Sequence, residues 1–395
     1  MVALCLAAAA GVALWSYITS TAVPLHPIAQ DVPSVTRGGP AAWAEAAVQG
    51  RQIARAAVSA GNLPGVSVAV GVGDDIVWAE GFGWADLERR TPVTPETRFR
   101  IGTASTALTS AAVGLLLERG RLDLEAPIQT YVPVYPRKSE PVTLGQLMAN
   151  VAGVGNDNGA EGPFYERHCE RPLDAVPVFA EDDLRFVPGT EYRGSSYGWI
   201  LVSAAVEAAA GEPFLRVMRK QIFEPLGMDD TTADTAAGSH GERAVPYFPR
   251  FAADTTYGPE AMRAIDLSCY AGAAVFVSTP SDLVRFGLAM QRGALVRPET
   301  VARLQGPVTL GSGQPTGFGL GWDLGTAILA GTETRMVGRR GTVLGGRVAS
   351  LTTYPDLRLV VAVTSNTSYA DTTALARDVA GAFAAQAARA VAAAR

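Results

Sequence analysis

The stretch Phe99-Arg100-Ile101-Gly102-Thr103-Ala104-Ser105-Thr106 decides the fold expected for this chain. Residues 106–119 follow it as an almost unbroken apolar run. The pattern predicts a tight turn from a strand into a buried helix, and Gly102 suits such a turn because glycine tolerates unusual backbone angles. The hydroxyl of Thr103 then lies at the start of the helix, where an activated alcohol could act as a nucleophile.

The bulk composition is that of a folded protein. The chain has 395 residues, of which 48% are hydrophobic and 18% charged, enough to form one large domain or two closely packed lobes. The formal net charge is −5, and basic residues occur only singly or in pairs. Nucleic-acid binding is therefore not expected.

The N-terminal 25 residues carry no charge and are long enough for a helix that crosses a bilayer. Trp15 and Tyr17 lie toward the end of this segment, as aromatic residues do at a membrane interface. A cleavable signal peptide is the alternative, with Ser20-Thr21-Ala22 as the cleavage site. Because no Lys or Arg precedes the apolar run, residues 1–25 are predicted to be an uncleaved transmembrane anchor.

The rest of the chain divides into a linker and one large domain. Residues 26–44 contain several prolines and predict an extended linker, and residues 45–390 predict the domain. Within the domain, strand patterns occur near both ends, around a middle that reads as mostly helical. The expected fold class is therefore α/β (α+β), with an α/β lobe over about 45–103 and 310–395 and a helical lobe over about 104–309.

Motifs along the whole domain resemble those of the serine β-lactamase and penicillin-binding protein family, especially its mitochondrial serine β-lactamase-like members. They occur in the family's order and cover roughly residues 45 to 385. The matching segments are Phe99–Thr106, Glu118–Pro136, Thr143–Met148, Phe186–Thr190, Ile222–Met228, Ser278–Phe286 and Phe318–Trp322. The resemblance implies a β-lactamase/transpeptidase-like fold, in which helices flank an antiparallel sheet and a mostly helical lobe is inserted.

The nucleophile element of that family reads Ser-x-x-Lys, and here it is altered. Thr103 stands at the serine position and Thr106 at the lysine position. An alcohol such as Thr106 cannot accept and return a proton near neutral pH. Lysine occurs only at positions 138 and 220, so no Ser-x-x-Lys exists elsewhere in the chain.

The other two catalytic elements of the family are also altered. The resemblance aligns the tyrosine of Tyr-x-Asn with Gly194 and its asparagine with Ser196, while Tyr192 and Tyr197 flank the site. Arg339 stands at the first position of the Lys/His-x-Gly element. An arginine could hold a carboxylate, but it stays protonated in proteins and cannot shuttle protons. The pocket is therefore predicted to be vestigial, with no intact catalytic residue.

Cysteines and histidines do not predict a metal or cofactor site. Cys5 lies in the N-terminal segment, and Cys169 and Cys269 are expected as separate buried thiols in preference to a disulfide. His168 beside Cys169 lacks a second pair at zinc-ligand spacing. No cofactor is expected.

Three functions are compatible with this pattern. The favoured one is a membrane-anchored pseudoenzyme that serves as a structural or accessory subunit of a larger assembly, such as a respiratory complex. The second is a residual esterase or peptidase that uses Thr103. The third is a pocket that binds an anionic peptide or acyl group through Arg339 or Arg340 without turnover.

The resemblance also suggests a location and partners. It implies the mitochondrial inner membrane, with the domain facing the intermembrane space, and the bacterial periplasm is the alternative. Other protein subunits are the expected partners, and self-association is left open.

Overall fold

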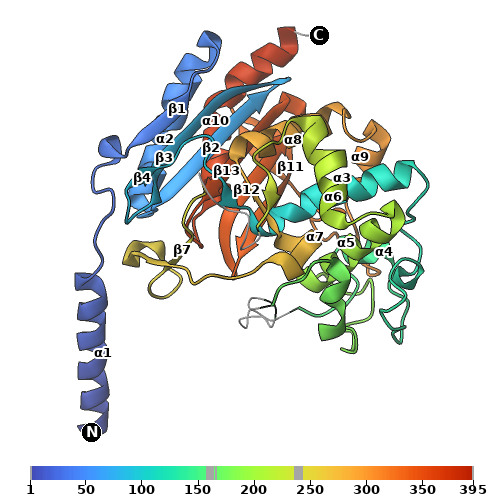
Figure 1. Cartoon of the computed structure of the whole chain (residues 1–395). Coiled ribbons are helices and arrows are strands. Elements are labelled where there is room, and N and C mark those ends of the chain that lie inside the picture. The colour runs from blue at the N-terminus through green and yellow to red at the C-terminus, as the bar shows by residue number, and fades with distance from the viewer. Residues whose placement is uncertain (1, 157–163, 165–166, 235–242, 394–395) are drawn as a thin grey trace.

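The computed structural model describes residues 2–156, 164, 167–234 and 243–393. A large antiparallel sheet lies at the centre of the domain. Figure 1 shows this sheet with helices on either side. Its strand order is β1-β3-β2-β13-β12-β11-β10, and β4 pairs with β3. The strands are β1 (Ser34–Arg37), β2 (Gly65–Val72), β3 (Asp75–Asp86), β4 (Thr91–Pro92), β10 (Asp323–Leu329), β11 (Thr332–Val343), β12 (Gly346–Tyr354) and β13 (Leu359–Ser365).

The two ends of the chain meet in the middle of this sheet. β13 pairs antiparallel with β2, so that Ala362 lies opposite Ala69. Both strands are buried along their whole length. Their nearly continuous apolar sequences are typical of strands that are covered on both faces, because each side chain then packs against a core. The predicted fold class, with strands from both ends of the domain in one sheet, is confirmed.

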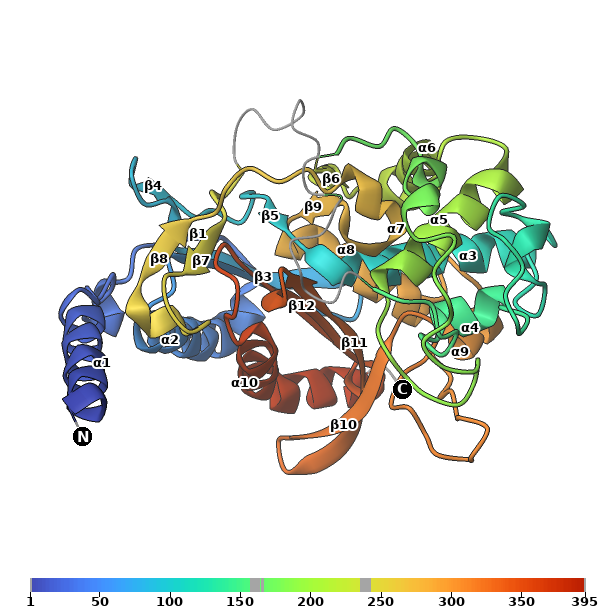
Figure 2. The same ribbon diagram turned by 90° about the horizontal axis from the view of Figure 1, so that it is seen from below.

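Two hydrophobic cores form on the two faces. On one face, α2 (Ala44–Ala60) and α10 (Thr372–Ala393) pack side by side against the sheet, and Figure 2 shows both helices on that side. On the other face lies α8 (Pro280–Arg292), which joins the sheet to the helical part of the molecule. The remaining helices of that part are α3 (Ser105–Glu118), α4 (Leu144–Met148), α5 (Ser196–Ala210), α6 (Phe214–Met218), α7 (Ala271–Ala274) and α9 (Pro298–Leu304).

Short strands connect these layers. β5 (Phe99–Arg100), β9 (Phe276–Ser278) and β6 (Thr232–Ala233) form a small sheet that leads into α3. β7 (Tyr247–Pro249) pairs with β8 (Pro259–Ala261). The residue ranges predicted from the sequence for the linker (26–44) and for the two lobes of the domain remain predictions.

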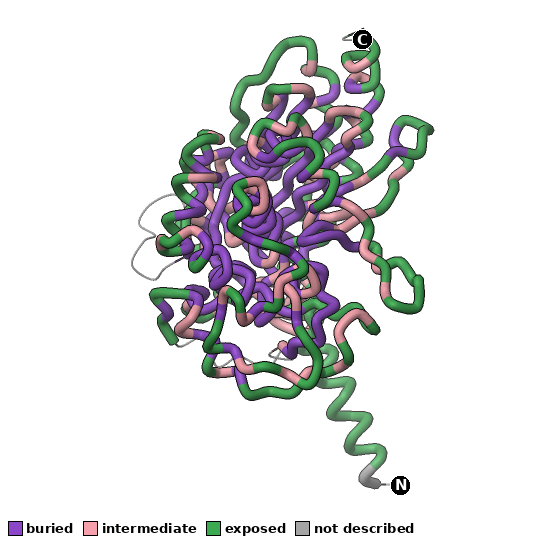
Figure 3. The backbone as a smooth tube through the Cα atoms, turned by 90° about the vertical axis from the view of Figure 1, so that its right-hand side faces the viewer, coloured by how far each residue is buried: buried purple, intermediate pink, exposed green. Residues whose placement is uncertain are grey.

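The N-terminal helix α1 (Val2–Ser20) projects from the domain in Figure 1, and Figure 3 colours most of it as exposed. Its exposed residues include large apolar ones such as Leu4, Leu6 and Trp15. In the part of the chain that the structure describes, no helix is both long enough and apolar enough to cross a membrane. The transmembrane anchor expected over residues 1–25 is therefore not confirmed. The Trp15 ring meets Tyr257 edge to face, with ring centroids 6.4 Å apart.

Cys169 and Cys269 form a disulfide, so the expectation of two separate thiols was wrong. The two residues are 100 positions apart in sequence, a separation from which no contact could be predicted. Cys169 lies just before the 3₁₀ turn Pro172–Asp174 and Cys269 lies in the 3₁₀ turn Ser268–Tyr270, and both turns pack against α5. The disulfide therefore links segments that the helical core already brings together.

Removing this disulfide should destabilise the fold. A cross-link that closes a loop of this length limits the unfolded chain, and its loss lowers the free energy of unfolding by about 2–5 kcal/mol. The measurement is urea unfolding of the Cys169→Ala/Cys269→Ala double variant beside the wild type. Cys5→Ala is the control and should leave stability unchanged, because Cys5 is an exposed free cysteine. Equal stability of the double variant and the wild type would contradict the prediction.

Candidate functional site

Two glycines set the position of the site by allowing the start of α3 to lie directly on β11. A Cβ at Gly102 would lie 2.2 Å from the carbonyl oxygen of Thr342, and one at Gly341 would lie 2.0 Å from that of Ile101. Gly102 also has a φ of +51°, which favours glycine. Any side chain at either position would push the helix away from the strand. The close approach places Thr103 beside Thr342.

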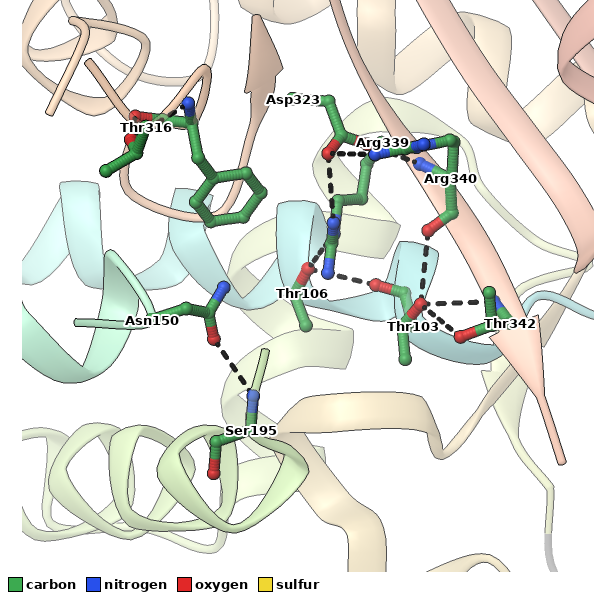
Figure 4. Close-up of polar contacts among 10 residues, drawn as sticks. Thr103, Thr106, Asn150, Ser195, Thr316, Asp323, Arg339, Arg340 and Thr342 are labelled. Atoms are coloured by element: carbon green, nitrogen blue, oxygen red, sulfur yellow. Dashed lines mark hydrogen bonds and ion pairs between the residues drawn. The ribbon is translucent and has the colours of Figure 1, made fainter. Parts of the chain in front are cut away.

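The Thr103 hydroxyl is held against β11 (Figure 4). Its Oγ1 lies 3.1 Å from the Arg340 carbonyl oxygen, to which it donates, and 3.1 Å from Oγ1 of Thr342. The same oxygen accepts a hydrogen bond of 3.1 Å from the backbone N–H of Thr342. None of these contacts is with a side chain that can take up a proton at neutral pH.

Thr106 faces a guanidinium group. Its Oγ1 donates to the Thr103 carbonyl oxygen at 2.9 Å and accepts a hydrogen bond of 2.8 Å from Nε of Arg339. The Arg339 guanidinium lies 4.9 Å from the centre of the Phe318 ring, a cation–π distance. A fixed positive charge therefore lies beside the position that the resemblance assigns to a lysine.

Asp323 is the shared counter-ion of two adjacent arginines (Figure 4). Its carboxylate accepts from Nη1 of Arg339 at 3.3 Å and from the backbone N–H, Nε and Nη2 of Arg340 at 3.0, 3.3 and 3.3 Å. The Asp323 and Arg339 side chains are largely buried, with 15% and 13% exposed. Charge-assisted hydrogen bonds of this kind are about twice as strong as neutral ones, so they fix both guanidinium groups.

The first turn of α5 forms the opposite wall. Oγ of Ser195 accepts from the Gly198 N–H at 2.9 Å, which caps the helix, and donates to the Gly155 carbonyl oxygen at 2.7 Å. Ser196 is tied through its backbone N–H to Oδ1 of Asn156 at 3.2 Å. Gly194 contributes no side chain, and open space surrounds the place where one would be.

The five positions singled out from the sequence all line one cavity of about 260 Å³: Thr103, Thr106, Gly194, Ser196 and Arg339. The structure thus brings together every residue predicted for the site. The two tyrosines that flank the site in sequence, Tyr192 and Tyr197, are placed differently from these five positions. Tyr197 is buried and stacks on Phe179, with ring centroids 4.5 Å apart, and it does not line the cavity.

Tyr192 lies closer to the site but is a poor base. Its ring packs against Phe318 at 5.5 Å. Burial raises the pKa of the Tyr192 hydroxyl above its usual value, and the charges of Arg339 and Arg340 offset this only in part. The hydroxyl therefore stays protonated at neutral pH and cannot take a proton from Thr103.

Ser110 in α3 and His168 both make structural contacts. Oγ of Ser110 donates to the Leu320 carbonyl oxygen at 2.6 Å and accepts from Nε1 of Trp322 at 3.3 Å. His168 lies with Nδ1 2.8 Å from a carboxylate oxygen of Asp266. Among the residues with a described structure, no group of three or more His, Cys, Asp or Glu side chains is placed to hold a metal ion.

Sequence reasoning missed several residues of the cavity, among them Asn150, Trp199 and Arg347. Within the described part of the chain, Nδ2 of Asn150 and Nε1 of Trp199 are buried donors that make no hydrogen bond. The amide of Asn150 interacts with the Tyr192 hydroxyl without reaching hydrogen-bonding geometry. No pattern in the sequence indicates that these two donors are unsatisfied, because their surroundings come from distant segments. Asp323 could have been noticed, since it directly follows the Phe318–Trp322 motif.

The role of Asp323 can be tested with Asp323→Asn. Loss of the shared charge leaves Arg339 partly buried beside Arg340 without a counter-ion, so the free energy of unfolding should fall by about 2–4 kcal/mol, near the range for broken buried pairs. Chemical denaturation measures the change. Asp378→Asn is the matched control. Asp378 and its partner Arg377 are both about half exposed, and exposed ion pairs contribute about 0–1 kcal/mol to the free energy of unfolding. Equal effects of the two substitutions would refute the assigned role.

The absence of a hydrogen bond from Nε1 of Trp199 to any described residue can be tested by comparison with Trp322, whose Nε1 does donate one. Trp199→Phe and Trp322→Phe remove similar volume from fully buried positions, but only Trp322 loses a hydrogen bond, to Ser110. Trp322→Phe should therefore destabilise the protein by about 1 kcal/mol more than Trp199→Phe, the usual net value of one hydrogen bond. Thermal and urea unfolding of both variants give the comparison, and a larger loss for Trp199→Phe would contradict it.

Comparison with known proteins agrees with this fold. The Beta-lactamase family model matches residues 51–386. The serine beta-lactamase-like protein LACTB, mitochondrial, from Homo sapiens is 28% identical over 333 residues, which covers 62% of this chain and 59% of the relative. The Mus musculus protein of the same name is 26% identical, with 62% of this chain and 60% of the relative covered. The chain thus spans about three fifths of the length of these curated relatives.

Solved structures show the same fold at lower identity. The D-amino acid amidase from Ochrobactrum anthropi SV3 superposes with a TM-score of 0.73 at 20% identity, covering 87% of this chain and 99% of that one. An octameric penicillin-binding protein homologue from Pyrococcus abyssi gives a TM-score of 0.71 at 21% identity, covering 84% and 75%. From the family match over most of its length and from this shared architecture, the chain belongs to the beta-lactamase family.

Proposed function

We propose that this protein is a β-lactamase-like pseudoenzyme that acts through protein contacts as an accessory subunit of a larger assembly. One observation carries the first half of the proposal: among the residues that the structure describes, the Thr103 hydroxyl is bonded to β11 and contacts no group that could take its proton. A threonine is a nucleophile only when a base activates it. A positioned general base typically contributes about 10²–10⁴-fold to such a reaction.

The surroundings of Thr103 oppose its activation further. The backbone N–H of Thr342 donates to the Thr103 hydroxyl itself, so it is not free to stabilise a negatively charged oxygen of a substrate. The nearest cation, Arg339, is held by Thr106 and Asp323 and stays protonated. The site then holds its side chains in place but, within the described residues, has no group that transfers protons.

Several features support an accessory role. The apolar side chains of α1 are exposed, and such a surface is typical of a contact with another molecule. The Pyrococcus abyssi homologue is octameric, which supports self-association as one form of assembly. We propose that α1 provides the attachment to partner subunits.

Two further observations support the proposed location of the protein. The mammalian relatives are named as mitochondrial proteins, which supports a mitochondrial location and an inner-membrane complex, such as a respiratory complex, as the assembly. The Cys169–Cys269 disulfide favours an oxidising compartment. The intermembrane space and the bacterial periplasm both satisfy that condition, and the second is the alternative location.

The proposal predicts that Thr103→Ala changes no catalytic rate. Wild type and variant should give the same background hydrolysis of an activated ester, a D-amino acid amide and a β-lactam, because the wild-type hydroxyl is not activated. Mass spectrometry of the intact protein should detect no acyl adduct. A rapid burst of product that disappears in Thr103→Ala would establish the alternative, a residual hydrolase that uses Thr103.

The accessory role predicts stable association. The protein purified from native membranes in mild detergent should migrate in native electrophoresis with a large complex in a fixed ratio. Removal of residues 1–20 should release it if α1 is the attachment, while the domain keeps its melting temperature. A lone monomer or homo-oligomer in both preparations would refute the subunit role.

A further inference from the structure

We propose that two copies of this chain join through the open edge of the large sheet, with β10 of one copy pairing antiparallel with β10 of the other. This inference goes beyond the proposed accessory role, because it names a second copy as one partner and assigns the contact to one strand. Figure 2 shows the hairpin of β10 and β11 projecting from the domain, where its outer edge can be reached.

The outer edge of β10 carries backbone groups that are free to bond. β10 is the last strand in the order of the sheet and pairs only with β11. The Leu324 N–H donates to the Gly317 carbonyl oxygen at 2.9 Å, so the backbone groups of Leu324 point away from β11. Because alternate residues of a strand point the same way, the N–H and C=O of Thr326 and Ile328 also face the open edge. No backbone group among the described residues bonds to them there.

The neighbouring strand confirms this direction. Arg335 of β11 lies opposite Thr326, and its N–H points to the far side, where it donates to a carboxylate oxygen of Asp356 at 3.2 Å. Two residues that face each other without bonding both point their backbone groups outward. The outward direction of the Thr326 groups therefore follows from both strands.

The bond to Gly317 limits which residues can pair with a second copy. Since the Leu324 N–H is already used, the free groups are those of Thr326 and Ile328, with one N–H and one C=O each. An antiparallel pairing centred on Ala327 sets Thr326 opposite Ile328 of the second copy, and Ile328 opposite its Thr326. All of these groups then bond across the twofold axis, so the edge is complementary to itself in this register.

β10 also lacks the features that usually keep an edge strand from pairing. Residues 324–332 contain no charged residue and no proline, and Ile328 is 76% exposed. The strand at the other edge, β1, has four residues, contains Arg37 and follows Pro33. Charge, proline and shortness are common protections of edge strands, so β1 is protected and β10 is not.

The charges beside β10 favour a second copy as the partner. On β11, Glu333 lies opposite Ile328 and Arg335 lies opposite Thr326. In the pairing centred on Ala327, Glu333 of one copy therefore shares a row and a face with Arg335 of the other, about 14 Å away along the sheet. These long side chains can reach toward each other over Ile328, which the pairing covers. The twofold axis produces this match of opposite charges twice.

The contact is small, so the expected dimer is weak. One short strand on each side buries less than the roughly 1,200 Å² below which interfaces are typically transient. We therefore expect a dissociation constant of about 1 μM or higher. Copies held close together in a common assembly would pair more fully, because tethering raises the effective concentration.

Cysteine cross-linking tests the register. Ala327 would face its own copy in a non-hydrogen-bonded pair, with Cα atoms about 4.5 Å apart, a distance that a disulfide can span. The full-length Cys5→Ala/Ala327→Cys variant, which lacks the exposed free cysteine, is oxidised mildly in detergent and analysed on a non-reducing gel. We expect a covalent dimer.

Thr332→Cys in the same Cys5→Ala background is the matched control. Thr332 is exposed on the same hairpin, but in the proposed pairing it lies about 20 Å from its copy, too far for a disulfide. This variant should stay uncross-linked. Absence of a dimer for Ala327→Cys, or equal cross-linking of the two variants, would overturn the inference.

Thr326→Pro tests the hydrogen bonds separately. Proline has no N–H, but at Thr326 that N–H faces the open edge, so the pairing with β11 and the melting temperature should be kept. Sedimentation velocity of the full-length protein should show self-association weakened at least about tenfold, since one hydrogen bond is lost on each side of the axis. Unchanged association of the folded variant would contradict the proposed pairing.

A charge exchange gives an independent control. Glu333→Arg places like charges in both rows and should weaken association at low salt, where exposed charges are least screened. Adding Arg335→Glu to the same chain restores opposite charges in each row and should restore association. Equal association of the single and double variants would count against this register.

Failure of the inference is distinct from failure of the proposed function. Cross-linking at Ala327 without a larger complex would refute the subunit role alone. A larger complex in which Ala327→Cys forms no cross-link to a second copy would overturn the pairing alone. Cross-linking of Ala327→Cys to a different protein would assign the edge to a strand of that protein and would also overturn the pairing.

Discussion

The close approach of Ile101 and Gly102 to Gly341 and Thr342 is the constraint on which the rest of the site depends. It allows the start of α3 to lie directly on β11, so that backbone atoms of one segment meet those of the other. Thr103 then reaches Thr342, and Thr106 reaches Arg339. An enzyme of this fold would use that contact to align a nucleophile with an oxyanion site. Here the same contact lets Thr103 bond to the strand.

The fold could be predicted from the sequence because its central strands leave strong local patterns. The apolar runs of β2 and β13 indicate strands buried on both faces, and the Phe99–Thr106 stretch indicates the turn into α3. Pairing of β2 with β13 needed more than these patterns, because nearly 300 positions separate the two strands. The strand patterns at both ends of the domain predicted one shared lobe, but not which strands pair within it. They also did not predict the disulfide between Cys169 and Cys269, which depends on how the helices pack.

The candidate site was predictable where the family motifs fix a position and unpredictable where only packing does. Thr103, Thr106, Gly194, Ser196 and Arg339 were all found by their register within motifs, and all five line one cavity. Asn150 and Trp199 belong to the same cavity, but what distinguishes them is a missing hydrogen bond. The lack of a partner is a property of three-dimensional surroundings. A residue type at a given sequence position does not reveal it.

Arg339, at the Lys/His position of the family motif, is held by Asp323 and Thr106, and this arrangement limits the chemistry that the site can perform. Acyl transfer needs a group that gives and takes a proton in each cycle, and a guanidinium held by Asp323 and Thr106 cannot do so. Binding an anion needs only charge and donors that stay in place. Pairing with Asp323 fixes Arg339 and Arg340 and, at the same time, limits the net charge that a ligand meets. Side chains that are already held in place favour binding, because little ordering remains to be done when a ligand arrives.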